Sequence, residues 1–146
     1  MFKFKLNAVW NYRQVVEEKK QLEFADGQRQ LEKEQAALEQ IIDEKARLTE
    51  QLKKMQHMSF NVADISLYLS YHELYNKKEE MQMEIVRAAR TEVDCRRSEL
   101  LEAVQQRKVM DKLNEDQLRE YQKEMAGRER RDADETAVTR FIRKKK

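Results

Sequence analysis

Hydrophobic residues recur at alternating spacings of three and four through the first part of the chain. When Leu31 is placed at heptad position a, the apolar residues Leu38, Ile41, Leu48, Leu52 and Met55 also lie at a or d positions, with Lys45 as a polar exception. The frame continues backwards to Phe24, Trp10 and Leu6, interrupted by Gly27, Lys20, Glu17 and Arg13. This spacing places one apolar stripe along a helix and predicts helix one over residues 4–57.

A second heptad frame begins at Ile65 and continues to Tyr121. Ten of its seventeen a and d positions are apolar or aromatic. The polar positions within it cost stability and fix the register, and they suggest that part of the seam is available to a partner. The pattern predicts helix two over residues 62–140, with a kink or fraying near Gly127, followed by a basic tail over 141–146.

A short connector over residues 57–61 separates the two frames. The residues Asn61-Val62-Ala63-Asp64 resemble a capping box, and Phe60 and Ile65 occupy the positions of a hydrophobic staple. Short connections between helices give antiparallel neighbours. We therefore expect an all-α fold, a single antiparallel coiled-coil hairpin over residues 1–146. Its second helix extends past the first from about residue 115.

Composition excludes most other architectures. The 146 residues include two glycines and no proline, so sheet-based folds with many tight turns are improbable. Charged residues make up 40% of the chain and the net charge is only +2, although both ends are basic. No apolar run approaches the roughly 20 residues of a membrane span, and the first residues lack the apolar core of a secretory signal. Together with a single cysteine, these features predict a cytoplasmic protein.

Residues able to support catalysis or metal binding are few and scattered. His57, His72 and Cys95 lie in different parts of the predicted hairpin, with no metal-ligand spacing between them. A two-helix rod offers no concave pocket in which a nucleophile could meet its base. We expect no enzymatic activity, no metal and no cofactor.

Apolar and aromatic residues cover nearly the whole circumference of helix two between residues 65 and 75. Tyr68, His72 and Tyr75 fall on the seam, where core packing explains them. Leu67, Tyr71 and Leu74 fall outside it, so they are either simply exposed or form a partner-binding surface. The basic ends also leave alternatives open, namely solvated charge, docking to an acidic protein, or binding to nucleic acid or an anionic membrane.

Several short motifs resemble FliJ-type flagellar export proteins. They are the opening Phe2-x-Phe4-x-Leu6-x-x-Val9 with Arg13 and Glu17-Glu18, the stretch Ser70-Tyr71-His72-Glu73-Leu74, the stretch Gln105-Gln106-Arg107-Lys108 with Leu113, and the Asp132–Lys146 tail with Asp134-Glu135. The resemblance covers the whole chain. It implies a coiled coil similar to the stalk of the rotary ATP synthase γ subunit. Such a protein binds and activates the hexameric export ATPase, links it to the membrane export gate and engages export chaperones.

The resemblance also suggests where the partners bind. The ATPase-facing tip would consist of Phe2, Phe4 and Leu6 together with Phe141, Ile142 and Arg143, and the gate-facing patch of Leu67, Tyr71 and Leu74. We expect the free protein to be a monomer that associates peripherally with the inner membrane at the flagellar base, without binding nucleic acid. The alternatives are a homodimeric coiled-coil spacer and a basic amphipathic protein that binds nucleic acid or membrane surfaces.

Overall fold

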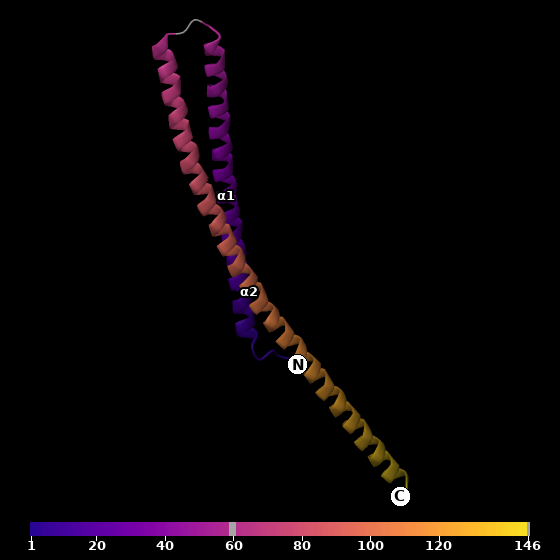
Figure 1. The fold of residues 1–146 in the computed structure, drawn as a ribbon. Helices are drawn as coiled ribbons and strands as arrows, with labels where there is room; N and C mark the ends of the chain where they lie inside the picture. The colour runs from indigo at the N-terminus through magenta and orange to yellow at the C-terminus, as the bar shows by residue number, and fades with distance from the viewer. Residues whose placement is uncertain (59–60, 146) are drawn as a thin grey trace. The chain divides into compact units, whose positions relative to one another are not determined.

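The computed structural model describes residues 1–58 and 61–145, and these residues form two long helices (Figure 1). Helix α1 spans Asn7–Gln56 with 50 residues, and helix α2 spans Val62–Lys144 with 83 residues. The described residues contain no strand. The helices are joined by the connector near residue 58 and pack against each other. The predicted all-α antiparallel hairpin is therefore confirmed.

Backbone hydrogen bonds define the helix ends at the connector. The carbonyl of Asn61 accepts hydrogen bonds from the amides of Asp64 at 3.1 Å and Ile65 at 3.4 Å, which starts α2. At the end of α1, the amide of His57 donates to the carbonyl of Lys54 at 3.3 Å, so the last turn tightens. The predicted staple involves Phe60, which lies outside the described residues.

The chain divides into two compact units, and each is described by itself. Unit one comprises residues 1–18 and 102–146, and unit two comprises residues 19–101. Each helix contributes a segment to both units. The assignment of residues 1–146 to one domain stays a prediction.

The heptad frames coincide with the surface along which the two helices meet. All seventeen a and d positions of α2 from Ile65 to Tyr121 are buried or half-buried. The most deeply buried are Val86 and Val93 in unit two and Ala103 in unit one. On α1, the a and d positions from Trp10 to Met55 are also at least half-buried, whereas Leu6 lies before the helix and is exposed. We call this surface the first seam.

In unit two, polar side chains of the first seam form an ion pair and hydrogen bonds between α1 and α2. The ammonium of Lys45 lies 2.8 Å from a carboxylate oxygen of Glu79. The side-chain amide of Gln82 donates to Glu34 twice, to the backbone carbonyl at 3.0 Å and to the carboxylate at 2.7 Å. These contacts satisfy polar groups that the neighbouring apolar layers would otherwise desolvate.

Gly27 is the one buried residue of α1, and it provides room for an arginine of α2. A Cβ atom at residue 27 would lie 3.1 Å from Cδ of Arg96 and 3.5 Å from Cγ2 of Val93. Arg96 passes over this gap, and its Nη1 donates to the backbone carbonyl of Glu23 at 2.7 Å. The sequence pattern treats Gly27 as an interruption of the seam, whereas in the structure it is a close contact between the helices.

A second polar cluster lies in unit one. The indole nitrogen of Trp10 donates to Asp111 at 2.8 Å, and the guanidinium of Arg13 donates to the side-chain oxygen of Gln106 at 2.6 Å. Arg107 pairs with both Glu17 of α1 and Asp111 of its own helix. The N-terminal part of α1 is thus held to α2 mainly by charge-assisted and aromatic contacts.

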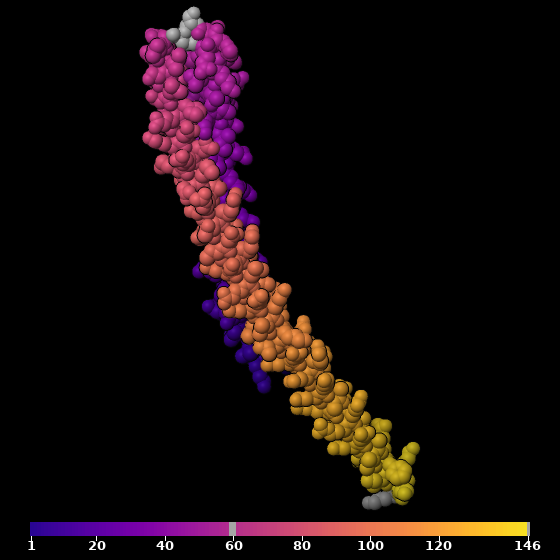
Figure 2. Space-filling view, viewed as in Figure 1, coloured from indigo at the N-terminus to yellow at the C-terminus, as the bar shows by residue number. Residues whose placement is uncertain are grey.

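The end of α2 continues past the N-terminal residues as a single helix (Figures 1 and 2). The helix continues without interruption through Gly127. It ends at Lys144, four residues after the end at residue 140 that the sequence predicts. One glycine inside a helix costs only about 1 kcal/mol relative to alanine, and helix-forming residues flank Gly127 on both sides. All described residues from Arg128 onward are exposed.

The two glycines should respond oppositely to a large side chain. Leucine at residue 27 must displace Arg96 and Val93, so Gly27→Leu should destabilise the hairpin by about 1–3 kcal/mol. Residue 127 has only Nη2 of Arg131 within 4.0 Å of the added Cβ. The control Gly127→Leu should therefore keep or slightly raise the melting temperature measured by circular dichroism. Equal melting temperatures for the two variants would contradict the packing described for Gly27.

Candidate partner-binding surfaces

The aromatic cluster at the start of α2 divides into an inner and an outer set. Tyr68, His72 and Tyr75 are half-buried in the first seam. The outer set consists of Leu67, Tyr71 and Leu74, whose exposed fractions are 53%, 48% and 47%. We call these three residues the outer patch. The structure brings them together on one face of one helix, three and four positions apart.

Other exposed apolar residues on α2 lie outside the set of binding residues predicted from the sequence. Leu69, Met81, Met83 and Ile85 are all substantially exposed in unit two. The signal that could have identified them is the second heptad frame itself, because all four fall outside its a and d positions. An apolar residue outside the seam of a two-helix coil has no helix within the chain to cover it.

Neighbouring carboxylates raise the pKa values of two titratable side chains in unit two. On the inner side of the outer patch, the Glu44 carboxylate of α1 interacts with the Tyr75 hydroxyl and raises the pKa of Tyr75 above 10.0. Glu99 and then Glu23 raise the pKa of Lys20 above 10.5 through hydrogen bonds. The ammonium of Lys20 lies 3.0 Å from Glu99 and 3.2 Å from Glu23. Both shifts favour the protonated side chain in the folded protein.

The N-terminal candidates contact their own chain in unit one. The ring of Phe2 lies 5.5 Å from that of Tyr121, and the ring of Phe4 lies 6.0 Å from that of Trp10 in an edge-to-face arrangement. Both phenylalanines are half-buried, while Leu6 is 38% exposed. The Phe2–Tyr121 pair holds the first residues against α2, and the Phe4–Trp10 pair packs them on the start of α1.

The C-terminal candidates lie far from the N-terminal ones along α2. Phe141 and Ile142 are 62% and 56% exposed, and Arg143 is exposed as well. Phe141 follows Tyr121, the contact of Phe2, by twenty residues, which is about 30 Å of helix. The structure therefore does not bring the two parts of the predicted ATPase-facing tip together.

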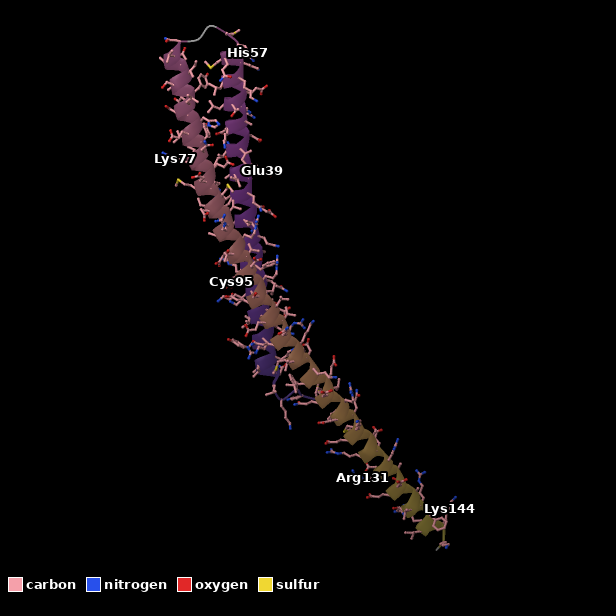
Figure 3. All side chains as sticks on the ribbon, viewed as in Figure 1. Glu39, His57, Lys77, Cys95, Arg131 and Lys144 are labelled. Atoms are coloured by element: carbon pink, nitrogen blue, oxygen red, sulfur yellow. The ribbon has the colours of Figure 1, made fainter. Side chains whose placement is uncertain are left out.

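A small apolar group forms at the end of α2 instead. Val138 is 58% exposed and lies three and four positions before Phe141 and Ile142, so the three side chains share one helix face. Basic residues surround them, and Figure 3 labels Arg131 and Lys144 on this part of the helix. The ammonium of Lys145 lies 5.1 Å from the centre of the Phe141 ring. We call Val138, Phe141 and Ile142 the tail group.

The potential catalytic residues are not assembled into a site. His57 is exposed near the connector, His72 is half-buried beside Asn76, and Cys95 is exposed with Glu99 as its neighbour at 3.9 Å (Figure 3). No group of three or more metal-ligating side chains occurs among the described residues. Within the same residues, no helix has a stretch long and apolar enough to cross a membrane.

Comparison with protein families identifies the chain's relatives. The model of the family described as "Flagellar FliJ protein" matches residues 2–146. The chain belongs to the FliJ family. Comparisons with curated proteins and with solved structures found no match.

Membership in the FliJ family gives the chain a role in flagellar protein export. FliJ proteins are non-catalytic components of that export system. The exposed apolar surfaces of this FliJ-family chain, rather than a pocket, are therefore its candidate functional sites.

The Tyr75–Glu44 interaction predicts a loss of stability at alkaline pH. Because Glu44 raises the folded-state pKa of Tyr75 above its ordinary 10.0, the folded protein holds this proton more tightly than the unfolded chain. The stabilisation is therefore present below pH 10 and is lost as the pH rises through the folded-state pKa. Tyr75→Phe should lower the free energy of unfolding, measured by urea titration, at pH 8 but not at pH 11.5.

Glu44→Gln provides the matched background for this measurement. Without the carboxylate, the effect of Tyr75→Phe on the free energy of unfolding should depend much less on pH, because only burial and Tyr71 then raise the pKa of Tyr75. An equally pH-dependent effect in the Glu44→Gln background would show that Glu44 is not the cause.

Proposed function

We propose that this protein is a non-enzymatic adaptor of flagellar type III export. In this proposal it binds and activates the hexameric export ATPase, links the ATPase to the membrane export gate, and engages export chaperones. It works as a monomer in the cytoplasm, peripheral to the inner membrane at the flagellar base. The observation that supports the proposal is that a FliJ-family hairpin exposes separate groups of apolar side chains that its own helices leave uncovered.

We assign the outer patch to the export gate. Leu67, Tyr71 and Leu74 supply one aromatic and two aliphatic side chains on a single helix face. Tyrosine is enriched among the residues that dominate binding energy in protein interfaces. The first seam beneath the patch fixes α2, so the three side chains are presented on a helix that is already folded. Binding then requires little further ordering of the backbone.

We assign the basic tail to the export ATPase. The tail group combines exposed apolar side chains with Arg140, Arg143 and Lys144, which suits a partner surface with an apolar groove and acidic margins. Phe2, Phe4 and Leu6, which the structure does not bring together with the tail group, are proposed as a separate contact with the same ATPase. Since Phe2 and Phe4 already pack on Tyr121 and Trp10, Leu6 and the tail group have more apolar surface left to bury.

Alanine substitutions test the gate assignment. Tyr71→Ala combined with Leu74→Ala should raise the dissociation constant for the purified cytoplasmic domain of the export gate at least tenfold, because the pair removes most of the outer patch. The far-ultraviolet circular dichroism should not change, since both side chains are exposed. Leu101→Ala is the control, an equally exposed leucine of unit two outside the patch. Unchanged affinity of the double variant would remove the assignment.

Shortening the chain tests the ATPase assignment. A chain that ends at residue 125 keeps the first seam, so it should still fold as a hairpin. It should fail to stimulate ATP hydrolysis by the purified export ATPase. Phe141→Ala with Ile142→Ala should reduce stimulation in the full-length chain, whereas Val109→Ala, at another exposed residue of unit one, should not. Full stimulation by the shortened chain would place the ATPase contact elsewhere.

A further inference from the structure

A second stripe of apolar residues runs along the outer face of α2 in unit two. It begins at the outer patch and continues with alternating steps of four and three residues. Its positions are Leu67, Tyr71, Leu74, Lys78, Met81, Ile85, Ala88, Glu92 and Cys95. Seven of the nine are apolar, counting the tyrosine and the cysteine, and all nine are exposed. We call this stripe the second seam.

The spacing of the second seam is that of a coiled-coil interface. Steps of four and three average 3.5 residues, the repeat that keeps one helix face against a partner helix. The stripe covers about four heptads, or roughly 42 Å, which is the length over which such a repeat indicates a coiled coil. It occupies heptad positions c and g, whereas the first seam uses a and d. Helix α2 therefore carries two seams, of which α1 covers one.

The charged positions of the second seam indicate what the missing partner must supply. The Glu92 carboxylate already pairs with Nε of Arg96 at 2.9 Å. Lys78 lies with its ammonium 5.0 Å from the centre of the Tyr75 ring, and no carboxylate among the described residues forms an ion pair with it. A helix covering the seam would desolvate this ammonium, so that helix needs an acidic side chain opposite Lys78.

Self-association through the second seam cannot satisfy Lys78. Lys78 and Glu92 are two heptads apart and occupy equivalent positions. In a symmetric parallel pair each would face its own copy, which sets lysine against lysine. In an antiparallel pair the layers combine c with g positions, so Lys78 and Glu92 never face one another. Lys78 would then oppose an apolar residue such as Ala88.

We propose that the second seam, from Leu67 to Cys95, binds a long amphipathic helix of another protein as a third strand. That helix has apolar residues repeating every three and four positions and an acidic residue opposite Lys78. The inference extends the outer patch to a surface nearly four times as long along the same helix face. It holds whether or not the export gate supplies the helix, so its test uses no export component.

The probe is a synthetic helical peptide of 28 residues with leucine and isoleucine at its a and d positions and one glutamate in the layer that faces Lys78. The control peptide has lysine in place of that glutamate. Binding of each fluorescent peptide to the full-length protein is measured by anisotropy. We expect the glutamate peptide to bind at least tenfold more tightly than the lysine peptide. Lys78→Glu should reverse that preference.

Two residues with the same exposed fraction separate the second seam from the rest of α2. Ile85 lies on the seam and Met83 lies off it, and each is 46% exposed. Ile85→Glu should abolish binding of the glutamate peptide, and Met83→Glu should leave it within twofold. Met81→Glu is another variant on the second seam, at a more exposed residue, and should also abolish binding. It replaces Ile85→Glu in the comparison if that variant does not fold. Each variant's helicity is checked by circular dichroism.

Three results would overturn the proposal. They are equal affinity for the two peptides, equal loss of binding in Ile85→Glu and Met83→Glu, and absence of binding to the unmodified protein. Sedimentation equilibrium of the protein alone tests whether a second copy of this chain covers the second seam. A dimer that Ile85→Glu converts to a monomer would show that the seam is covered by a second copy of this chain and not by a helix of another protein.

Discussion

The structure depends on a single narrow contact between α1 and α2, and that contact is only partly apolar. Val86, Val93 and Ala103 are its most deeply buried hydrophobic residues among those described, and the remaining seam residues keep more solvent exposure. Because few residues of this interface are deeply buried, its stability depends on the number of layers along the two helices and on the polar residues that bind across them. Lys45 with Glu79 and Gln82 with Glu34 bind across the helices where apolar layers are missing. Exposed ion pairs contribute little individually, so their main effect is to define which layers face each other.

The narrow interface between the two helices also explains why the candidate binding sites are exposed helix faces. A two-helix contact covers only one side of each helix, and any apolar residue on another side stays in solvent. The outer patch, the tail group and the second seam all consist of such residues. In a chain with 40% charged residues, apolar side chains outside the seam are few enough for their grouping to be informative. The proposed binding surfaces of this FliJ-family chain are therefore the helix faces that remain uncovered.

The regular part of the fold could be predicted from the sequence because helix pairing follows a strict repeat. The frame from Ile65 to Tyr121 marks the contact surface of α2 without an exception, and the connector near Asn61 follows from the change of frame. The exposure of Leu67, Tyr71 and Leu74 follows from the same repeat, because they lie outside it. Their binding role stays a prediction, since a repeat indicates exposure but not what covers an exposed residue.

Other features could not be read from a heptad pattern. The frame treats Gly27 as a defect, because a pattern of residue types does not show that an arginine from the other helix crosses there. The packing of Phe2 on Tyr121 depends on the path of residues that precede α1, to which no helical repeat applies. The second seam was present in the sequence, but it becomes apparent only once α1 is known to cover the first one.

The crossing of Arg96 over Gly27 has a mechanical consequence for the hairpin in unit two. Sliding the helices past one another by one heptad would move Arg96 from the glycine to Lys20 or Glu34, the neighbouring seam positions of α1. Lys20 would repel the guanidinium, and the shift toward Glu34 would break the two hydrogen bonds from Gln82 to Glu34. Either step also breaks the bond to the Glu23 carbonyl. The glycine–arginine contact therefore favours one axial register of the two helices over its one-heptad neighbours.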